Sequence, residues 1–279
     1  MSRRQTRPTF YQSASDLWPS QSTDSIIVEC DSLDQPIFTL PGEFFQLGAQ
    51  SPSTVSFLLY VVNAVTRIQG NFILLSGDGH KAEQCDPIRV GTYSVQFTEP
   101  NGRIQWRKGP QGKRTKQPFS EQAGDSSVSA SSQATGRSGQ ENFREQLRTT
   151  HGRCVVSKKR WEVCVAAHIV PQSLGQELVD RLTGNRRLIG YMSVHNGLLL
   201  AADLHKAFDL YLWSIYWDQS LNCFVFHDFF GDFSQYHGQK IELQSMRSRP
   251  LLQWHYDQTL MARARAFTYW PSERDVPYE

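Results

Sequence analysis

The sequence predicts an α+β protein with two folded parts and a linker between them, and three observations support this. Hydrophobic residues make up 39% and aromatic residues 12% of the 279 positions, which is enough to fill a core. Strand-like and helix-like apolar patterns occur on both sides of the middle of the chain. Residues 109–140 consist mostly of Gly, Ser, Gln and charged residues, which favours a disordered basic linker.

Residues 23–108 are expected to form a small α+β domain behind a flexible N-terminus, residues 1–22. Residues 55–65 carry apolar side chains at helical spacing, although their β-branched content leaves a strand as the alternative. The predicted strands are residues 25–30, 36–40, 72–75 and 92–97. The order of two strands, a helix and two strands is compatible with a β-grasp-like domain. The sequence indicates no chemical role for this part and no partner for it.

Elements of both kinds are also expected after the linker, in a domain of residues 141–235 and a C-terminal extension of residues 236–279. The predicted helices are residues 141–149, residues 173–182, a short helix beginning near Ala202, and about 250–267 in the extension. The predicted strands are residues 153–157, 162–166, 198–200, 211–217 and 223–227, the last two as a hairpin.

Charge is unevenly distributed, although the formal net charge is only +2. The acids of residues 21–100 are Asp24, Glu29, Asp31, Asp34, Glu43, Asp78, Glu83, Asp86 and Glu99, against Arg67, Lys81 and Arg89. Residues 101–120 contain bases and no acid, and bases outnumber acids over residues 141–190. Such asymmetry permits a polyanionic partner, and a solvated basic face is the equally weighted alternative.

The chain is expected in the nucleus or the cytoplasm, neither secreted nor held in a membrane. Its longest apolar run, residues 57–62, is too short to cross a bilayer, and no apolar stretch follows the first arginines. The five cysteines include no Cys-x-x-Cys pair, which suits a reducing compartment. Basic clusters at 113–116 and 158–160 fit nuclear-import signals or, equally, solvated turns.

Three short motifs carry chemistry-bearing side chains in a combination that chance rarely produces. They are Ala-Ala-His-Ile-Val-Pro at 166–171, His-Asn-Gly-Leu-Leu-Leu at 195–200 and Asp-Leu-His-Lys-Ala-Phe-Asp at 203–209. In this order and spacing the sequence resembles the HNH endonuclease family, in particular its branch with these three motifs. The resemblance covers residues 144–230 and implies a ββα-metal fold, metal-dependent hydrolysis of phosphodiester bonds and a nucleic-acid substrate.

The residue types suit that chemistry on independent grounds. His205 and Asp209 stand four apart on one predicted helix, so their side chains can converge on a divalent cation. An imidazole and a carboxylate suit Mg²⁺, Mn²⁺ or Zn²⁺. An imidazole such as that of His168 can take a proton from an attacking water, the general-base role that the family gives to the strand histidine. Asn196 precedes a glycine, and its amide can fix the loop that carries the base.

Double-stranded DNA is the favoured partner, with phosphate contacts that carry no base information. The candidate contact residues are basic side chains in the turn before the first motif and between the first two motifs: Lys158, Lys159, Arg160, Arg181, Arg186 and Arg187.

The metal site has one departure from the common family pattern. Ala167 stands where many HNH nucleases place an Asp or a His that binds the metal, and the branch that the chain most resembles also has alanine at this position. His195 is the possible third ligand, and Asp203 is better explained as a helix-start residue. Cys154 and Cys164 could bind zinc, but no second pair of cysteine ligands follows in the sequence. This favours their interpretation as buried thiols.

Two further interpretations compete with the enzyme. One is a catalytically inactive HNH scaffold that binds nucleic acid or protein, because active and inactive members share a scaffold. The other is a purely structural metal that holds the helix to the hairpin.

Overall fold

The computed structural model describes residues 25–33, 36–42, 54–107, 130–184, 189–219, 221–229 and 231–264. The chain divides into two compact units, Met1–Gly109 with Thr259–Glu279, and Pro110–Gln258, which are described separately below. Residues 1–22, residues 109–129 of the expected linker and residues 265–267 of the expected last helix lie outside the described residues. No helix in the described ranges is both long and apolar enough to cross a membrane.

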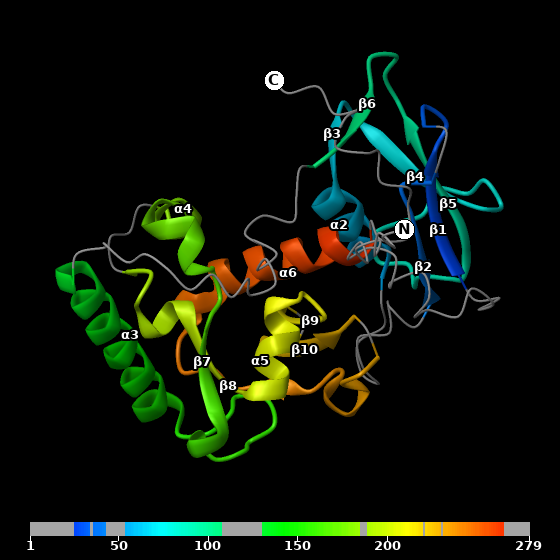
Figure 1. Ribbon diagram of the computed structural model, residues 1–279. Helices are drawn as coiled ribbons and strands as arrows, with labels where there is room; N and C mark the ends of the chain where they lie inside the picture. The colour runs from blue at the N-terminus through cyan, green and yellow to red at the C-terminus, as the bar shows by residue number, and fades with distance from the viewer. Residues whose placement is uncertain are drawn as a thin grey trace, which may run out of the picture. The chain divides into compact units, whose positions relative to one another are not determined.

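The first unit contains a four-stranded sheet in the order β2-β1-β5-β4 (Figure 1). Its strands are β1 (Ser25–Cys30), β2 (Phe38–Pro41), β4 (Phe72–Ser76) and β5 (Gly91–Phe97). The central pair β1 and β5 is parallel, whereas β2 and β4 run antiparallel to their neighbours. Every second residue of β1 is buried, as expected when one face of a strand covers a core.

Residues 55–65 form a helix, α2 (Val55–Val65), so the helical spacing outweighs the β-branched content. The helix buries Val55, Leu58, Val61, Val62 and Val65, and burial of such a stripe stabilises a helix more than propensity does. Two strands were not expected from the sequence, β3 (Thr66–Gln69) and β6 (Arg103–Trp106), which pair antiparallel. Their mixed, half-exposed sequences carry little periodic signal.

The second unit is built around a β-hairpin-like pair and the helix that follows it. β7 (Cys164–His168) pairs antiparallel with β8 (Gly197–Ala201), and α5 (Ala202–Asp209) begins at the residue after β8. All five residues of β8 are buried, and Leu198, Leu199 and Leu200 belong to one large apolar cluster with Phe208 of α5. The unit also contains α3 (Ala130–His151), α4 (Gly175–Leu182), β9 (Trp213–Asp218), β10 (Cys223–Asp228), β11 (Lys240–Ile241) and the first part of α6 (Arg249–Ala264).

Two expectations for this unit were wrong. Residues 153–157 form a turn instead of a strand: Lys158 has a positive φ of 58°, and the N–H of Cys154 donates to the carbonyl of Lys159. The buried run of Cys154, Val155 and Val156 resembles a strand in sequence. Helix α3 begins at Ala130, inside the expected disordered linker. Phe143 and Leu147 bury their side chains further along α3, and extension of an anchored helix costs little.

Candidate active site

His168 is the last residue of β7 and is paired with Gly197 of β8. The imidazole stacks on the ring of Phe143, with the ring centroids 4.2 Å apart and the planes 13° from parallel. Gly197 makes room for this aromatic ring, because a Cβ at that position would lie 2.6 Å from Cζ of Phe143. The glycine at the start of β8 therefore permits α3, which carries Phe143, to approach the imidazole at the end of β7.

Asn196 holds the backbone immediately after His168. Its side chain is fully buried; Oδ1 accepts the N–H of Val170 at 2.8 Å, and Nδ2 donates to the carbonyls of Val170 at 3.2 Å and Tyr191 at 3.0 Å. The backbone carbonyl of Asn196 accepts the N–H of Ile169 at 3.0 Å. These bonds fix the chain that follows the imidazole, which is the geometric role expected for this amide.

The imidazole of His168 is largely desolvated and lies within electrostatic range of His205. Burial is the first cause and the electrostatic effect of His205 the second cause that lower its pKa to about 4. Its Nε2 is buried and has no hydrogen-bond partner among the described residues. At neutral pH the ring is therefore uncharged and carries an unused polar atom.

His205 and Asp209 lie one turn apart on α5. Nε2 of His205 is 3.4 Å from Oδ2 of Asp209, and the two side chains are 27% and 60% exposed. Leu204, Ala207 and Phe208 take the buried face of the same short helix. The apolar pattern of α5 thus turns both polar side chains toward its open face.

Residues 154–216 match the family model of the HNH endonucleases. The matched segment, called the HNH segment below, contains β7, β8, α5 and the three motifs. No curated protein and no solved structure matches the chain. The resemblance to this family in the sequence motifs is confirmed over residues 154–216, while the particular branch is not.

The donor atoms on α5 of the HNH segment suit a divalent cation. Two atoms that each lie about 2.1 Å from one ion, at angles between octahedral and tetrahedral, are roughly 3.0–3.4 Å apart. The His205–Asp209 separation of 3.4 Å falls at the upper end of that range. A neutral imidazole and a carboxylate would leave the other coordination positions to water and phosphate oxygens.

The HNH segment does not bring His195 to this pair. Within the described ranges, no group of three or more His, Cys, Asp or Glu side chains is placed to hold a metal ion. Burial and then the positive charge of Arg247 lower the pKa of His195, so a cation is its neighbour. Among the described residues His195 therefore joins no such group, and its role as a third ligand stays a prediction.

The expected DNA-contacting residues lie at three places. Lys158, Lys159 and Arg160 are exposed in the turn before β7. Lys159 makes an ion pair of 3.6 Å with Asp203, and Arg160 one of 3.9 Å with Glu162. Arg181 is exposed in the last turn of α4, and Arg186 and Arg187 lie outside the described residues.

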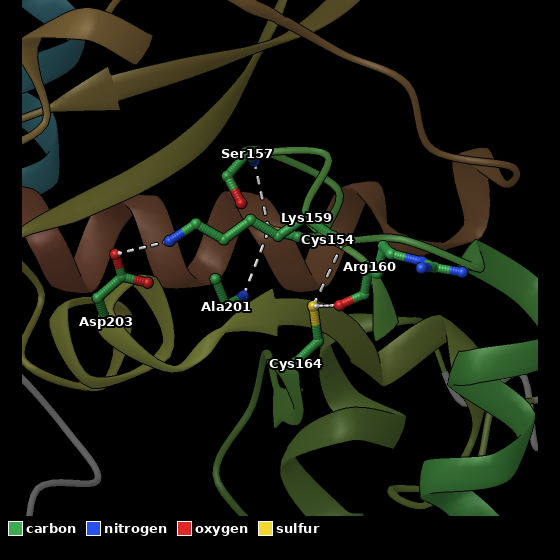
Figure 2. Close-up of polar contacts among 7 residues, drawn as sticks. All are labelled: Cys154, Ser157, Lys159, Arg160, Cys164, Ala201 and Asp203. Atoms are coloured by element: carbon green, nitrogen blue, oxygen red, sulfur yellow. Dashed lines mark hydrogen bonds and ion pairs between the residues drawn. The ribbon is translucent and has the colours of Figure 1, made fainter. Parts of the chain in front are cut away.

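Cys154 and Cys164 act as hydrogen-bonding thiols at the start of the HNH segment (Figure 2). Sγ of Cys154 accepts the N–H groups of Ser157 and Ala201, each at 3.3 Å. The thiol of Cys164 donates to the carbonyl of Arg160 at 3.2 Å, and burial is the first cause that raises its pKa. These contacts favour the interpretation as buried thiols. Ala201 precedes α5, so Cys154 ties the basic turn to the base of the helix that carries His205.

Proposed function

We propose that the chain is a metal-dependent HNH endonuclease that hydrolyses phosphodiester bonds of DNA. The single observation that carries the proposal is the half-buried imidazole of His168, whose buried Nε2 is unpartnered among the described residues and whose pKa is influenced by His205 of the cation-binding pair. A general base needs a neutral lone pair within reach of the water that attacks the phosphate. Burial of a polar atom without a partner costs free energy, which is expected where the partner is a substrate.

In this proposal His205 and Asp209 hold the metal, His168 acts as the general base and Asn196 positions it. A divalent cation, Mg²⁺, Mn²⁺ or Zn²⁺, held by His205 and Asp209, would supply Lewis-acid stabilisation of the charge that develops on the phosphate. His168 takes the proton of the water that attacks phosphorus. Asn196 holds the loop behind His168, so that the imidazole keeps its direction. Attack opposite the 3′-oxygen would give 5′-phosphate and 3′-hydroxyl ends.

Double-stranded DNA is the proposed substrate of this site. Lys158, Lys159, Arg160 and Arg181 would contact phosphates, and Arg186 and Arg187 are proposed for the same role. The ion pairs of Lys159 with Asp203 and of Arg160 with Glu162 are exposed and weak, so a polyanion can compete for these two basic groups. Binding that depends on phosphate contacts is strongly salt-dependent and does not read sequence.

Plasmid cleavage by the full chain tests the proposal. With Mg²⁺ or Mn²⁺ the wild type is expected to nick plasmid DNA, and His168→Ala to lower the rate by about 10²–10⁴-fold. His80→Ala, at an exposed histidine of the first unit, is the matched control and should cleave as the wild type does. If the wild type retards the plasmid on a gel yet leaves it intact with every metal, the endonuclease proposal fails.

The alternative function is a catalytically inactive HNH scaffold that binds nucleic acid or protein. The observation that favours it is the small ligand set: in the described part of the chain, two side chains meet where a cation could bind, and no third donor joins them. In this case His168→Ala and the wild type would bind DNA equally and neither would cleave it.

For the remaining parts, we propose residues 23–108 as a β-grasp-like domain, residues 141–235 as the HNH domain and residues 236–279 as its extension. The parallel pair β1–β5 at the centre of a mixed sheet, with α2 between β2 and β4 in sequence, supports the first assignment. We propose the nucleus or the cytoplasm as the location. The free thiols of Cys154 and Cys164 suit a reducing compartment.

A further inference from the structure

Exposed apolar side chains gather at the entrance to β7. Trp161, Val163 and Val165 are 41%, 59% and 38% exposed and occupy alternate positions of the segment that leads from a 3₁₀ turn into β7. We call these three residues the Trp161 strip. The other large apolar side chains that are exposed in the described part of the chain, Val90, Trp106 and Met246, lie far apart in sequence. Exposed large apolar side chains that lie close together in the chain are a feature of binding surfaces.

The indole of Trp161 is held in place at this surface by a cation. The guanidinium of Arg148, on α3, lies 4.7 Å from the centroid of the indole ring. A guanidinium that stacks on one side restricts the ring to a narrow range of orientations and leaves the rest of the π surface to a ligand. Arg148 also pairs with Glu145, whose side chain is 57% exposed. The aromatic platform is therefore preorganised.

The strip is bordered by positive charge. Lys158, Lys159 and Arg160 are exposed and immediately precede Trp161. The acids nearby, Asp203 and Glu162, form exposed ion pairs of 3.6 and 3.9 Å with Lys159 and Arg160, and such pairs yield to a polyanion. An exposed aromatic ring beside a cluster of cations is the arrangement that binds single-stranded nucleic acid, with bases on the ring and phosphates on the cations.

We infer that the Trp161 strip binds unpaired nucleotides of the nucleic acid that occupies the active site. This inference rests on the proposed function only in taking nucleic acid as the ligand of the HNH segment. Trp161 lies seven residues before His168, which at the rises of a 3₁₀ turn and a strand corresponds to about 20 Å. At the duplex rise of 3.4 Å this span is roughly six base pairs, so an unpaired flank would begin no further than that from the active site. The structure thus favours a substrate with a duplex at the active site and an unpaired flank on the strip.

Equilibrium binding to the full chain tests the inference in EDTA, so that hydrolysis plays no part. Fluorescence anisotropy would compare a labelled 20-nucleotide oligothymidine with a blunt duplex of equal length. Trp161→Ala is expected to weaken single-strand binding roughly 5- to 100-fold and duplex binding less than about threefold. Trp161→Phe should stay within about threefold of the wild type. The matched control is Trp106→Ala, at a 37% exposed tryptophan of the first unit, which should change neither affinity.

Salt dependence separates stacking from phosphate contacts. Trp161→Ala should leave the slope of log K against log salt unchanged, whereas Lys158→Ala should reduce the single-strand slope by about 0.7. The inference is wrong if Trp161→Ala binds oligothymidine as the wild type does, or if it loses single-strand and duplex affinity equally. If Trp161→Ala melts at a lower temperature than the wild type, Trp161→Phe becomes the test. Single-strand affinity of Trp161→Phe within about threefold of the wild type supports the inference, and a larger loss contradicts it.

These outcomes are independent of the endonuclease proposal. Selective loss of single-strand binding in Trp161→Ala supports the strip even if no plasmid is ever cleaved. Plasmid cleavage that depends on His168, together with unchanged oligothymidine binding by Trp161→Ala, would overturn the strip and leave the enzyme in place. Failure of the wild type to bind either nucleic acid would overturn the strip as well.

Discussion

Burial affects His168 as a general base in two opposite ways while no substrate is bound. Burial against Phe143 keeps the imidazole neutral at physiological pH, so its lone pair is ready to accept a proton. The same burial makes the protonated form costly, which weakens the base. A bound phosphate would bring a negative charge to the unpartnered Nε2 and raise the pKa toward the range that proton transfer needs.

The free energy of unfolding should depend on pH because burial lowers the pKa of His168. The pKa of His168 falls from 6.5 in the unfolded chain to about 4 in the folded chain, so the unfolded chain binds more protons between these values. The contribution of His168 to stability is therefore complete above pH 6.5 and is lost as the pH falls toward 4, by at most about 3 kcal/mol. Urea unfolding at pH 7.5 and 4.5 should show a smaller decrease for His168→Asn than for the wild type. Equal decreases would contradict a desolvated imidazole.

Asn196→Ala should destabilise the second unit by about 2–4 kcal/mol, because it leaves the buried N–H and carbonyl of Val170 without the amide that bonds them. Urea unfolding measures this change. Asn71→Ala is the matched control, since Asn71 bonds Glu99 at the exposed surface of the first unit and should change stability by less than about 0.5 kcal/mol. A small effect of Asn196→Ala would show that water replaces the amide in the loop.

The close approach of α3 to the strands β7 and β8 depends on the absence of a Cβ atom at Gly197. Gly197→Ala would place a Cβ 2.6 Å from Phe143 and 2.8 Å from Leu147, closer than real contacts allow. The expected cost is about 1–3 kcal/mol of unfolding free energy. Gly139→Ala, on the same helix, meets no atom nearer than 4.0 Å and is the control. Phe143→Leu in the Gly197→Ala background should recover part of the loss, and additive losses would exclude a clash.

The open face of α5 predicts a specific effect of metal on stability. Mn²⁺ at one hundred times its dissociation constant should stabilise the wild type by about 2.7 kcal/mol, because it binds the folded chain alone. His205→Ala and Asp209→Asn should lose this increment, measured as the shift in melting temperature. Asp203→Asn is the control, since Asp203 lies on the same helix with a side chain as exposed as that of Asp209. Equal shifts in all variants would place the cation elsewhere.

The elements that sequence predicts best are those whose periodicity is strong and whose neighbours are local. The apolar positions of α5 and the i,i+4 spacing of His205 and Asp209 define one helix face without any tertiary information, and the structure places the pair 3.4 Å apart. The strand at 198–200 and the last hairpin were found for the same reason. Residues 153–157 were misread, because consecutive buried side chains in a turn give the pattern of a strand.

The features of the candidate site that the sequence could not predict depend on tertiary contacts. Phe143 lies twenty-five positions before His168, and no local pattern links the two rings. The glycine that admits Phe143 was visible only as a turn residue after Asn196. The exposure of Trp161 also depends on packing, since tryptophan in a strand-like segment is equally typical of a core.

For the molecule as a whole, the distribution of charge decides which unit meets a polyanion. The formal net charge of +2 is small, yet acids dominate residues 21–100 and bases outnumber acids over residues 141–190, where the HNH segment begins. Like charges repel a phosphate backbone over about one Debye length, so the acidic unit is expected to stay off the DNA while the basic turn holds it. The net charge of the whole chain thus conceals a basic segment.

Charge reversal in each unit tests this division. Lys158→Glu should weaken duplex binding and lower the slope of log K against log salt by about 0.9, because one phosphate contact is lost and a repulsion is added. Arg67→Glu changes the total charge by the same amount at an exposed position of β3 and should leave both quantities nearly unchanged. Fluorescence anisotropy between 50 and 200 mM salt, on a labelled duplex in EDTA, measures both. If the two substitutions weaken binding equally, the DNA responds to total charge alone and the basic turn is not its site.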